Sequence, residues 1–207
     1  MKAGKTLIFL FIVTFCTFIL FAPVEANSAP KTAIKSTIES ILNILRDKNL
    51  SLPDKKAERR DKMRALIRDR FNFQEMGRRI LARHWKKRTS EEQKEFVSVF
   101  SELLEASYIS KIEAYTDEKV TYDKESIKSG GKYAMVSTTI ATKKVDIPID
   151  YKVKLRDSKW WIYDVVIEGV SFVSTYRSQY GKILKQESFA KLIQKMKNKL
   201  KEINAAT

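Results

Sequence analysis

Apolar and polar side chains alternate without interruption from Val145 to Arg156, and this pattern constrains the fold more than any other feature of the 207-residue sequence. A strand places successive side chains on opposite faces, so strict alternation indicates a half-buried β-strand with one packed and one solvated face. The apolar positions are Val145, Ile147, Ile149, Tyr151, Val153 and Leu155. Such a strand is typical of an antiparallel sheet that covers a core with one face.

The same period of two extends over neighbouring segments and predicts a sheet between residues 119 and 168. Candidate strands span residues 119–127, 133–143, 145–156 and 160–168. They are joined by Gly130-Gly131, Lys143-Lys144 and Asp157-Ser158-Lys159, and connections this short are typical of β-hairpins. We therefore expect four strands in an antiparallel sheet.

Helical periodicity replaces the alternation on both sides of this sheet. Residues 31–48 carry apolar side chains at helical spacings, Pro53 opens a second helix, and Asn72 starts a third that carries Trp85. The sequence TSEEQ at residues 89–93 is a capping box, which predicts the start of a long helix. Helical patterns return at about residues 173–185 and 188–203.

Helices gathered on one face of an antiparallel sheet make an α+β fold. We expect a helical part at residues 31–116 and 173–203 and a sheet at 119–168, within a single domain of residues 27–207. A curved four-stranded antiparallel sheet packed against several helices would enclose an apolar cavity. The alternative is a filled core, which periodicity alone favours.

Residues 1–26 have the pattern of a secretory signal peptide. An apolar run over residues 7–21 follows two lysines. It precedes Val24-Glu25-Ala26, which fits a cleavage site of the small-x-Ala kind. The run of about 15 residues is shorter than the roughly 20 that span a bilayer, although an uncleaved anchor is an alternative. We expect an exported protein that loses its only cysteine, Cys16, on cleavage and therefore has neither a disulfide nor a cysteine metal site.

The net charge of +15 narrows the choice of partners. Residues 55–88 hold fourteen Lys and Arg against four Asp and Glu, which predicts a basic surface on the second and third helices. Outside the cytoplasm, the available anions are phospholipid headgroups, envelope polymers and acidic proteins, so we expect no nucleic acid partner. A solvated polar helix face is the alternative interpretation of this charge.

Residues that could carry catalysis do not form a recognisable constellation. The single histidine, His84, lies beside Trp85 on a helix, and Ser171 lacks the second glycine of a nucleophile elbow. Carboxylates four residues apart on a strand, such as Asp146 and Asp150, are about 13 Å apart, too far for a glycosidase pair. We expect no enzyme activity, no metal and no cofactor.

Motifs between residues 70 and 195 follow one another with a specific spacing. They are FNFQEMGRRIL at 71–81, TSEEQ at 89–93, IPIDY at 147–151, and YDVVIEGVS at 163–171 followed by YRSQY at 176–180. In this order they resemble the MlaC family, also called the toluene-tolerance auxiliary proteins. The resemblance implies a periplasmic protein that carries phospholipid between an outer-membrane lipoprotein complex and an inner-membrane ABC transporter complex. A monomer is the default expectation for a shuttle that hands its load to other proteins.

The resemblance also implies that the acyl tails lie between sheet and helices. Two acyl chains together hold about 30 methylenes, and moving them through water costs on the order of 20–25 kcal/mol. An apolar cavity offsets this cost without any cofactor. The expected tail-lining residues are Phe100, Leu103, Leu104 and Tyr108 on the long helix and Val145, Ile147, Ile149, Tyr151, Val153, Trp161, Tyr163 and Val165 on the sheet. Tyr176, Arg177 and Gln179 are expected at the cavity mouth.

Two alternatives to the carrier remain at this point. One is a basic envelope adaptor protein with a filled core, and the other is a divergent hydrolase on a cone-shaped α+β fold. The adaptor predicts that a charge placed in the sheet's apolar row unfolds the protein. The carrier predicts that some such substitutions leave a folded protein that binds less lipid.

Overall fold

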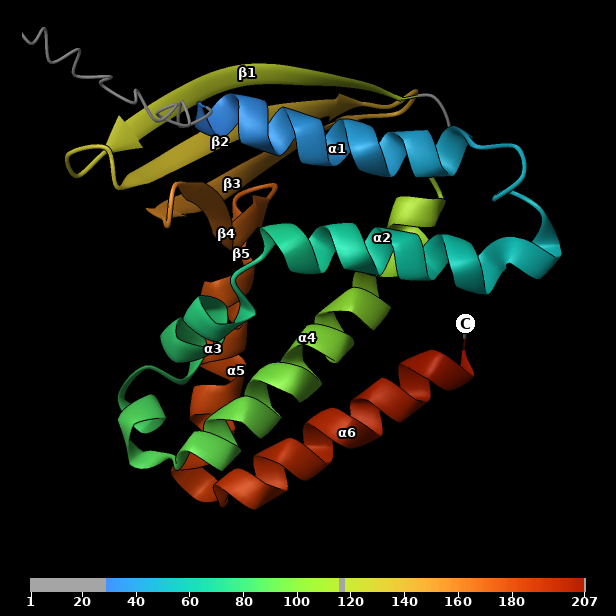
Figure 1. Cartoon of the computed structure of the whole chain (residues 1–207). Helices are drawn as coiled ribbons and strands as arrows, with labels where there is room; N and C mark the ends of the chain where they lie inside the picture. Colours follow the sequence, from blue (N-terminus) through green and yellow to red (C-terminus); the bar gives the residue numbers. More distant parts are fainter. Residues whose placement is uncertain (1–28, 116–117, 207) are drawn as a thin grey trace, which may run out of the picture.

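An antiparallel sheet of five strands, in the order β1-β2-β3-β4-β5, forms one layer of the molecule (Figure 1). The computed structural model of the chain describes residues 29–115 and 118–206, so the expected signal peptide lies outside the described residues. The strands are β1 (Lys119–Lys128), β2 (Tyr133–Ala141), β3 (Asp146–Arg156), β4 (Lys159–Ile167) and β5 (Val170–Ser171). The α+β class and the antiparallel pairing are confirmed.

The predicted number of four strands is wrong, because a tight turn adds a short fifth strand. Glu168 and Gly169 both take positive φ angles, 48° and 80°, and reverse the chain after β4. Val170 then pairs with Ile167, and Ser171 with Val166. A two-residue strand has no detectable alternation, so periodicity could not reveal it.

Helices precede and follow the sheet along the chain. Before it come α1 (Pro30–Arg46), η1 (Pro53–Lys55), α2 (Lys56–Arg70), α3 (Phe73–Leu81), η2 (Ala82–Lys87) and α4 (Ser90–Glu113), and after it α5 (Phe172–Gln186) and α6 (Phe189–Ala205). The third helix is shorter than predicted, because Ala82 takes φ 46° and ends it, which places Trp85 in the 3-10 helix η2. Among the described residues, none of the helices combines the length and apolar character needed to cross a membrane.

Side-chain caps fix the starts of several helices. The capping box predicted before α4 is confirmed, since the Thr89 hydroxyl accepts from the Glu92 amide at 3.2 Å and the Glu92 carboxylate accepts from the Thr89 amide at 2.9 Å. Asn72 caps α3 and Ser171 caps α5 in the same manner. Each cap satisfies amides that the first helical turn leaves without a partner.

One buried cluster joins the sheet to the helices. It takes in Val136, Val153 and Ile162 from the sheet, Phe96 and Phe100 from α4, and residues of α1, α3, α5 and α6. Helix α1 lies along β1 and β2, and α4 runs beside α6 farther from the sheet (Figure 1). The core therefore lies between one face of the sheet and the surrounding helices.

Replacing Thr89 by Ala is expected to lower the free energy of unfolding by about 1 kcal/mol, because the Glu92 amide loses its acceptor. Urea denaturation followed by circular dichroism measures this change. Thr32→Ala is the matched control, since Thr32 is exposed on α1 and caps no helix. Equal midpoints for the two variants would contradict the assigned role of the capping box.

Candidate functional site

The inner face of the sheet is the face that carries Ala134, Val136, Tyr151, Val153 and Val165. Val136 is paired with Tyr151 and Tyr151 with Val165, while Ala134 is paired with Val153. Directly paired residues of an antiparallel ladder project to the same side, so these side chains form one continuous surface. Val136 and Val153 are fully buried there. The buried row predicted for the third strand is thus confirmed for Ile149 and Val153.

A bulge in β4 changes which of its residues face inward. Lys152 pairs with Asp164 but Val153 pairs with Ile162, which leaves Tyr163 as the extra residue. Trp160 and Ile162 are therefore buried on the inner face, and Val165 returns to that face beyond the bulge.

The prediction that Trp161 and Tyr163 line the inner face is wrong, because alternation cannot be counted through an unseen bulge. Trp161 pairs with Lys154 on the opposite face, and Lys159 lies 4.5 Å from its ring centroid. The ring of Tyr163 packs under the Arg79 guanidinium at 4.1 Å and against Tyr133.

Helices α4 and α5 supply aromatic side chains to the same core. Phe100, Leu103 and Leu104 are buried on α4 as predicted. Tyr176 of α5 meets Phe100 edge-on with centroids 5.2 Å apart, and Tyr108 lies 4.6 Å from Phe172. Tyr108 and Tyr176 remain only half-buried.

A group of apolar residues packs against the core but stays partly exposed, and we call it the half-buried apolar set. Its members come from α4 and from the inner face of the sheet: Tyr108, Ile112, Ile140, Ile147, Tyr151 and Ile167. Ile140 pairs with Ile147 near the turn between β2 and β3, so the set extends to that end of the sheet. Incomplete burial of inward-facing apolar side chains indicates a place where a ligand could gain contact area.

Val145 was predicted in this row but is 56% exposed and precedes β3. The turn accounts for this, because the Thr142 hydroxyl accepts from the amides of Lys144 and Val145 and donates to the Val145 carbonyl. The sequence prediction did not include three members of the half-buried apolar set, Ile112, Ile140 and Ile167. Ile140 continues the alternation of Ala134, Val136 and Thr138, so its signal was present in the second strand.

Tyr151 is one of the polar residues of the inner face. Its burial raises the pKa of the phenol to about 12, with a hydrogen bond to Thr138 acting in the opposite direction. The Thr138 hydroxyl itself donates to the Ile149 carbonyl at 3.2 Å. A neutral phenol can therefore serve as a fixed hydrogen-bond group inside an apolar surface at any physiological pH.

The three residues expected at a cavity mouth are not grouped together. Tyr176 packs in the core, whereas Arg177 and Gln179 are exposed. The Arg177 Nε donates to the Arg79 carbonyl at 2.8 Å and so ties α5 to the end of α3. A structural link between two helices explains the position of Arg177 without a ligand.

Asp164 holds the start of α5 against the sheet. It is 3% exposed and accepts hydrogen bonds from Ser171 Oγ at 2.7 Å, the Val173 amide at 3.0 Å and Lys152 Nζ at 2.9 Å. A carboxylate with three donors is satisfied in a buried position. The motif that contains Asp164 and Ser171 is thus structural.

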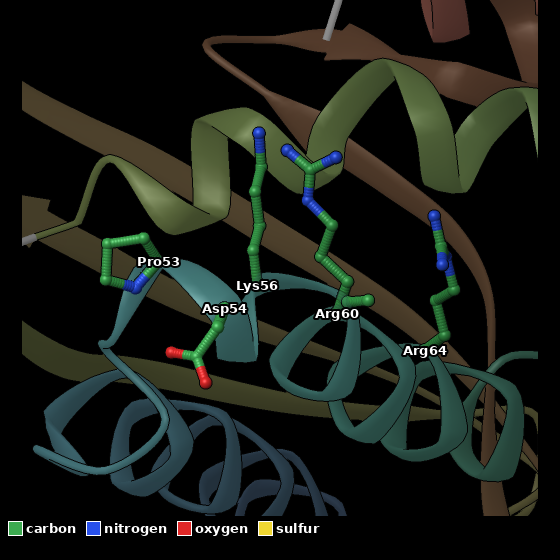
Figure 2. Close-up of a pocket in the computed structure, with 6 residues that line it drawn as sticks. Pro53, Asp54, Lys56, Arg60 and Arg64 are labelled. Carbon is green, nitrogen blue, oxygen red and sulfur yellow. The ribbon is translucent and has the colours of Figure 1, made fainter.

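Two described hollows lie on the surface and are lined largely by polar residues. The first has a volume of about 430 Å³ and is lined by Pro53, Asp54, Lys56, Ala57, Arg60 and Arg64 (Figure 2). The second, of about 200 Å³, is lined by Asn72, Gln74, Glu75, Arg78, Trp85, Lys154 and Arg156. Neither hollow is the predicted apolar cavity between the sheet and the helices. That cavity stays a prediction.

Much of the basic charge predicted on α2 is paired with α4. Arg68 donates to both Glu105 oxygens at 2.8 Å, and Arg59 and Arg60 both donate to Glu113. Burial acts to raise the pKa of Glu113, but the hydrogen bonds from Arg60 and Arg59 outweigh it and hold that pKa below its ordinary value. The basic segment therefore serves partly as a structural bridge between two helices.

Comparison with known proteins identifies the family. The sequence model of the MlaC protein family matches residues 35–198, which is most of the chain. The chain belongs to the MlaC family. This match includes the helices α2 to α5 and the sheet, so it covers the inner face and the half-buried apolar set.

Two relatives illustrate the likeness. The chain is 25% identical over 129 residues to the intermembrane phospholipid transport system binding protein MlaC of Haemophilus influenzae, and the match spans 60% of each chain. Its fold is similar to that of the phospholipid-binding protein from Ralstonia solanacearum, solved in complex with a phospholipid, with a TM-score of 0.75 and 21% identity. That likeness covers 86% of this chain and 99% of the other, and it shows the shared fold.

Replacing Tyr151 by Phe is expected to make the free energy of unfolding fall less steeply as the pH rises above 10. Because the folded-state pKa of Tyr151 is raised from 10.0 to about 12, the native state retains a proton that the unfolded chain releases. The stability from this group is therefore complete below pH 10 and is lost as the pH rises towards 12. Urea midpoints measured from pH 8.5 upward test this, and identical pH profiles for the two proteins would contradict it.

Proposed function

We propose that this MlaC family protein is a periplasmic phospholipid carrier. It would shuttle lipid between an outer-membrane lipoprotein complex and an inner-membrane ABC transporter complex, and so maintain the lipid asymmetry of the outer membrane. The exported part is residues 27–207, a single lipid-binding domain that acts as a monomer. Direction of transport comes from the partner complexes, because a passive pocket has no energy source of its own.

Family membership is the observation that carries this proposal. The relative from Haemophilus influenzae is named for phospholipid transport, and a neighbour with the same fold was solved with a phospholipid bound. Both names describe activities of those proteins, and the match over residues 35–198 supports extending them to this chain. The proposed role involves no chemical step and needs neither a metal nor a cofactor.

The acyl tails would lie against the inner face of the sheet, between it and helices α4 and α5. The half-buried apolar set supports this location, because it offers partly exposed apolar side chains next to a closed core. Each buried methylene contributes roughly 0.8 kcal/mol, so tails need many such contacts to leave a bilayer. Small movements of α4 relative to the sheet would open the space near Tyr108 and Ile112, which are only half-buried, whereas Phe100 is fully buried.

The basic adaptor with a filled core is the second candidate function. Complete burial of Val136, Val153 and Phe100 favours it, because none of these three side chains borders a space that a water-sized probe can enter. The two functions differ in whether lipid stays with the purified protein.

Native mass spectrometry of the protein from a periplasmic fraction, with lipid extraction from the same sample, tests the carrier. Co-purifying phospholipid at near-stoichiometric amounts is expected and would name the cargo. An apo mass that is unchanged after incubation with phospholipid vesicles would favour the adaptor.

Ile147→Gln is expected to reduce lipid occupancy while the protein stays folded, because Ile147 is only half-buried. An amide placed against acyl tails without a partner costs about 1–3 kcal/mol, which corresponds to binding weaker by roughly five- to 150-fold. Asp146→Gln is the matched control, since Asp146 is the exposed neighbour on β3. Bound lipid is measured by extraction, and folding by the urea midpoint. If both variants retain equal amounts of lipid, Ile147 is not part of the lipid-binding site.

A further inference from the structure

Three pieces of chain form the end of the molecule that lies away from the sheet: η2, the last turns of α5 and the first turn of α6 (Figure 1). The first turns of α4 lie against η2, because the Gln93 side-chain amide donates to the Trp85 and Arg88 carbonyls at 3.0 and 3.3 Å. The start of α6 adjoins the same place, since the Arg88 guanidinium lies 5.0 Å from the Phe189 ring centroid. Segments distant in sequence therefore meet at this end.

Five exposed lysines lie on these three pieces of chain, and we call them the basic end: Lys86, Lys87, Lys182, Lys185 and Lys191. Within residues 29–115 and 118–206, none of their ammonium groups has an ion pair or a hydrogen bond. Other lysines of α6 differ, because Lys195 pairs with Glu187 at 2.5 Å and Lys197 pairs with Glu95 at 2.6 Å. The basic end thus gathers charges that the fold leaves uncompensated.

The carboxylates near the basic end do not neutralise it. Glu92 accepts from Arg88 at 3.2 Å, and Glu187 is the partner of Lys195. Glu91 lies in the first turn of α4, where the positive end of the helix dipole favours a carboxylate. Five unpaired positive charges therefore face one carboxylate outside these ion pairs.

His84 lies within η2 and responds to the same positive charge. Burial lowers the pKa of His84, and Arg83, Lys87 and Arg88 lower it further by repulsion. A lowered pKa means that the surroundings disfavour one more positive charge. Cations of η2 are thus close enough together to act on one imidazole.

The composition of the basic end decides between a membrane and a protein as its partner. Among the described residues, the exposed large apolar side chains are Leu52, Ile127, Val145 and Val170, and all four lie on other parts of the molecule. Protein interfaces are built around an apolar centre, and they are depleted in lysine. An anionic bilayer needs no such centre, because each basic residue near the headgroups raises membrane partitioning by a factor of about five.

We propose that the basic end docks the protein on an anionic phospholipid bilayer, with its lysines against the headgroups and the sheet facing away. Helix α5 runs from the sheet to the basic end, and its 15 residues span about 22 Å. This is roughly two Debye lengths at 0.1 M salt, so charges on the sheet contribute little to docking. The docking surface rests on the proposed location in the cell envelope but not on lipid transport, since a protein with a filled core could dock equally.

The end variant removes four of these charges: Lys86→Gln, Lys87→Gln, Lys185→Gln and Lys191→Gln. Binding of the exported chain to vesicles with about 30% phosphatidylglycerol in phosphatidylcholine is measured by sedimentation at about 0.1 M salt. We expect the partition coefficient of the end variant to fall by roughly a hundredfold or more. Binding of the wild type should also weaken steadily as salt is added.

The sheet variant is the matched control: Lys128→Gln, Lys132→Gln, Lys143→Gln and Lys144→Gln. It loses the same charge from exposed lysines that lie beyond the two ends of β2. The nine residues of β2 separate these two pairs by about 30 Å, so the four lysines form no single surface. We expect the sheet variant to bind within about fivefold of the wild type. An equal loss in both variants, or equal binding of the wild type to pure phosphatidylcholine vesicles, overturns the inference.

The orientation on the membrane is tested with single cysteines, because residues 27–207 contain none. Gln186→Cys places a label at the end of α5, and Asp146→Cys places one at the start of β3. The emission of an environment-sensitive fluorophore should shift to shorter wavelength on docking at position 186 and stay unchanged at 146. A shift at 146 alone contradicts the proposed orientation and overturns the inference.

An acidic protein is the competing partner, and protease treatment separates the two. Membranes isolated from the producing cells are compared before and after their proteins are digested and washed away. Equal binding to both preparations supports headgroups as the partner. Loss of binding after digestion assigns the basic end to a protein and overturns the inference.

The outcome is distinguishable from that of the carrier proposal. Protein that co-purifies with lipid but does not bind phosphatidylglycerol vesicles would overturn the docking surface and leave the carrier in place. Lipid-free protein that docks through the basic end would do the reverse. Near-UV circular dichroism of each variant shows whether its fold is intact.

Discussion

A sheet with one apolar face has to be covered, and the rest of this structure depends on that constraint. The inner face joins Val136, Tyr151 and Val165 across three strands, and leaving it in water would cost roughly 25 cal/mol for each Å² of apolar surface. Helix α1 covers the β1 and β2 side, where the Lys31 amide donates to Glu125 on the inner face. The remaining helices close the core from the other side (Figure 1).

Carboxylates that are buried or nearly so hold these helices in position. Asp164 anchors the start of α5 to the sheet, and Glu105 and Glu113 hold α2 against α4. Removing one partner from such a pair is costly, because the remaining group is left buried without compensation. The ion pairs of Glu105 and Glu113 also fix where α2 packs on α4, since the arginines of α2 reach these carboxylates through long side chains.

The half-buried apolar set is the part of α4 and of the inner face where packing is incomplete. Partly exposed apolar side chains gain free energy when a complementary apolar surface covers them. Under the proposed function, acyl tails would supply that surface.

The sequence by itself determined the α+β class, the four long antiparallel strands, the capping box at Thr89 and the family, since each depends on local spacing. It also located Phe100, Leu103 and Leu104 of α4 and Ile149 and Val153 of β3 as buried, because regular periodicity assigns faces. Tertiary structure alone decided the inward face of β4, where the bulge at Tyr163 moves Trp161 to the opposite side. It also decided the exposure of Val145 and the pairing of the α2 arginines with α4, because these depend on a turn's hydrogen bonds and on groups distant in sequence.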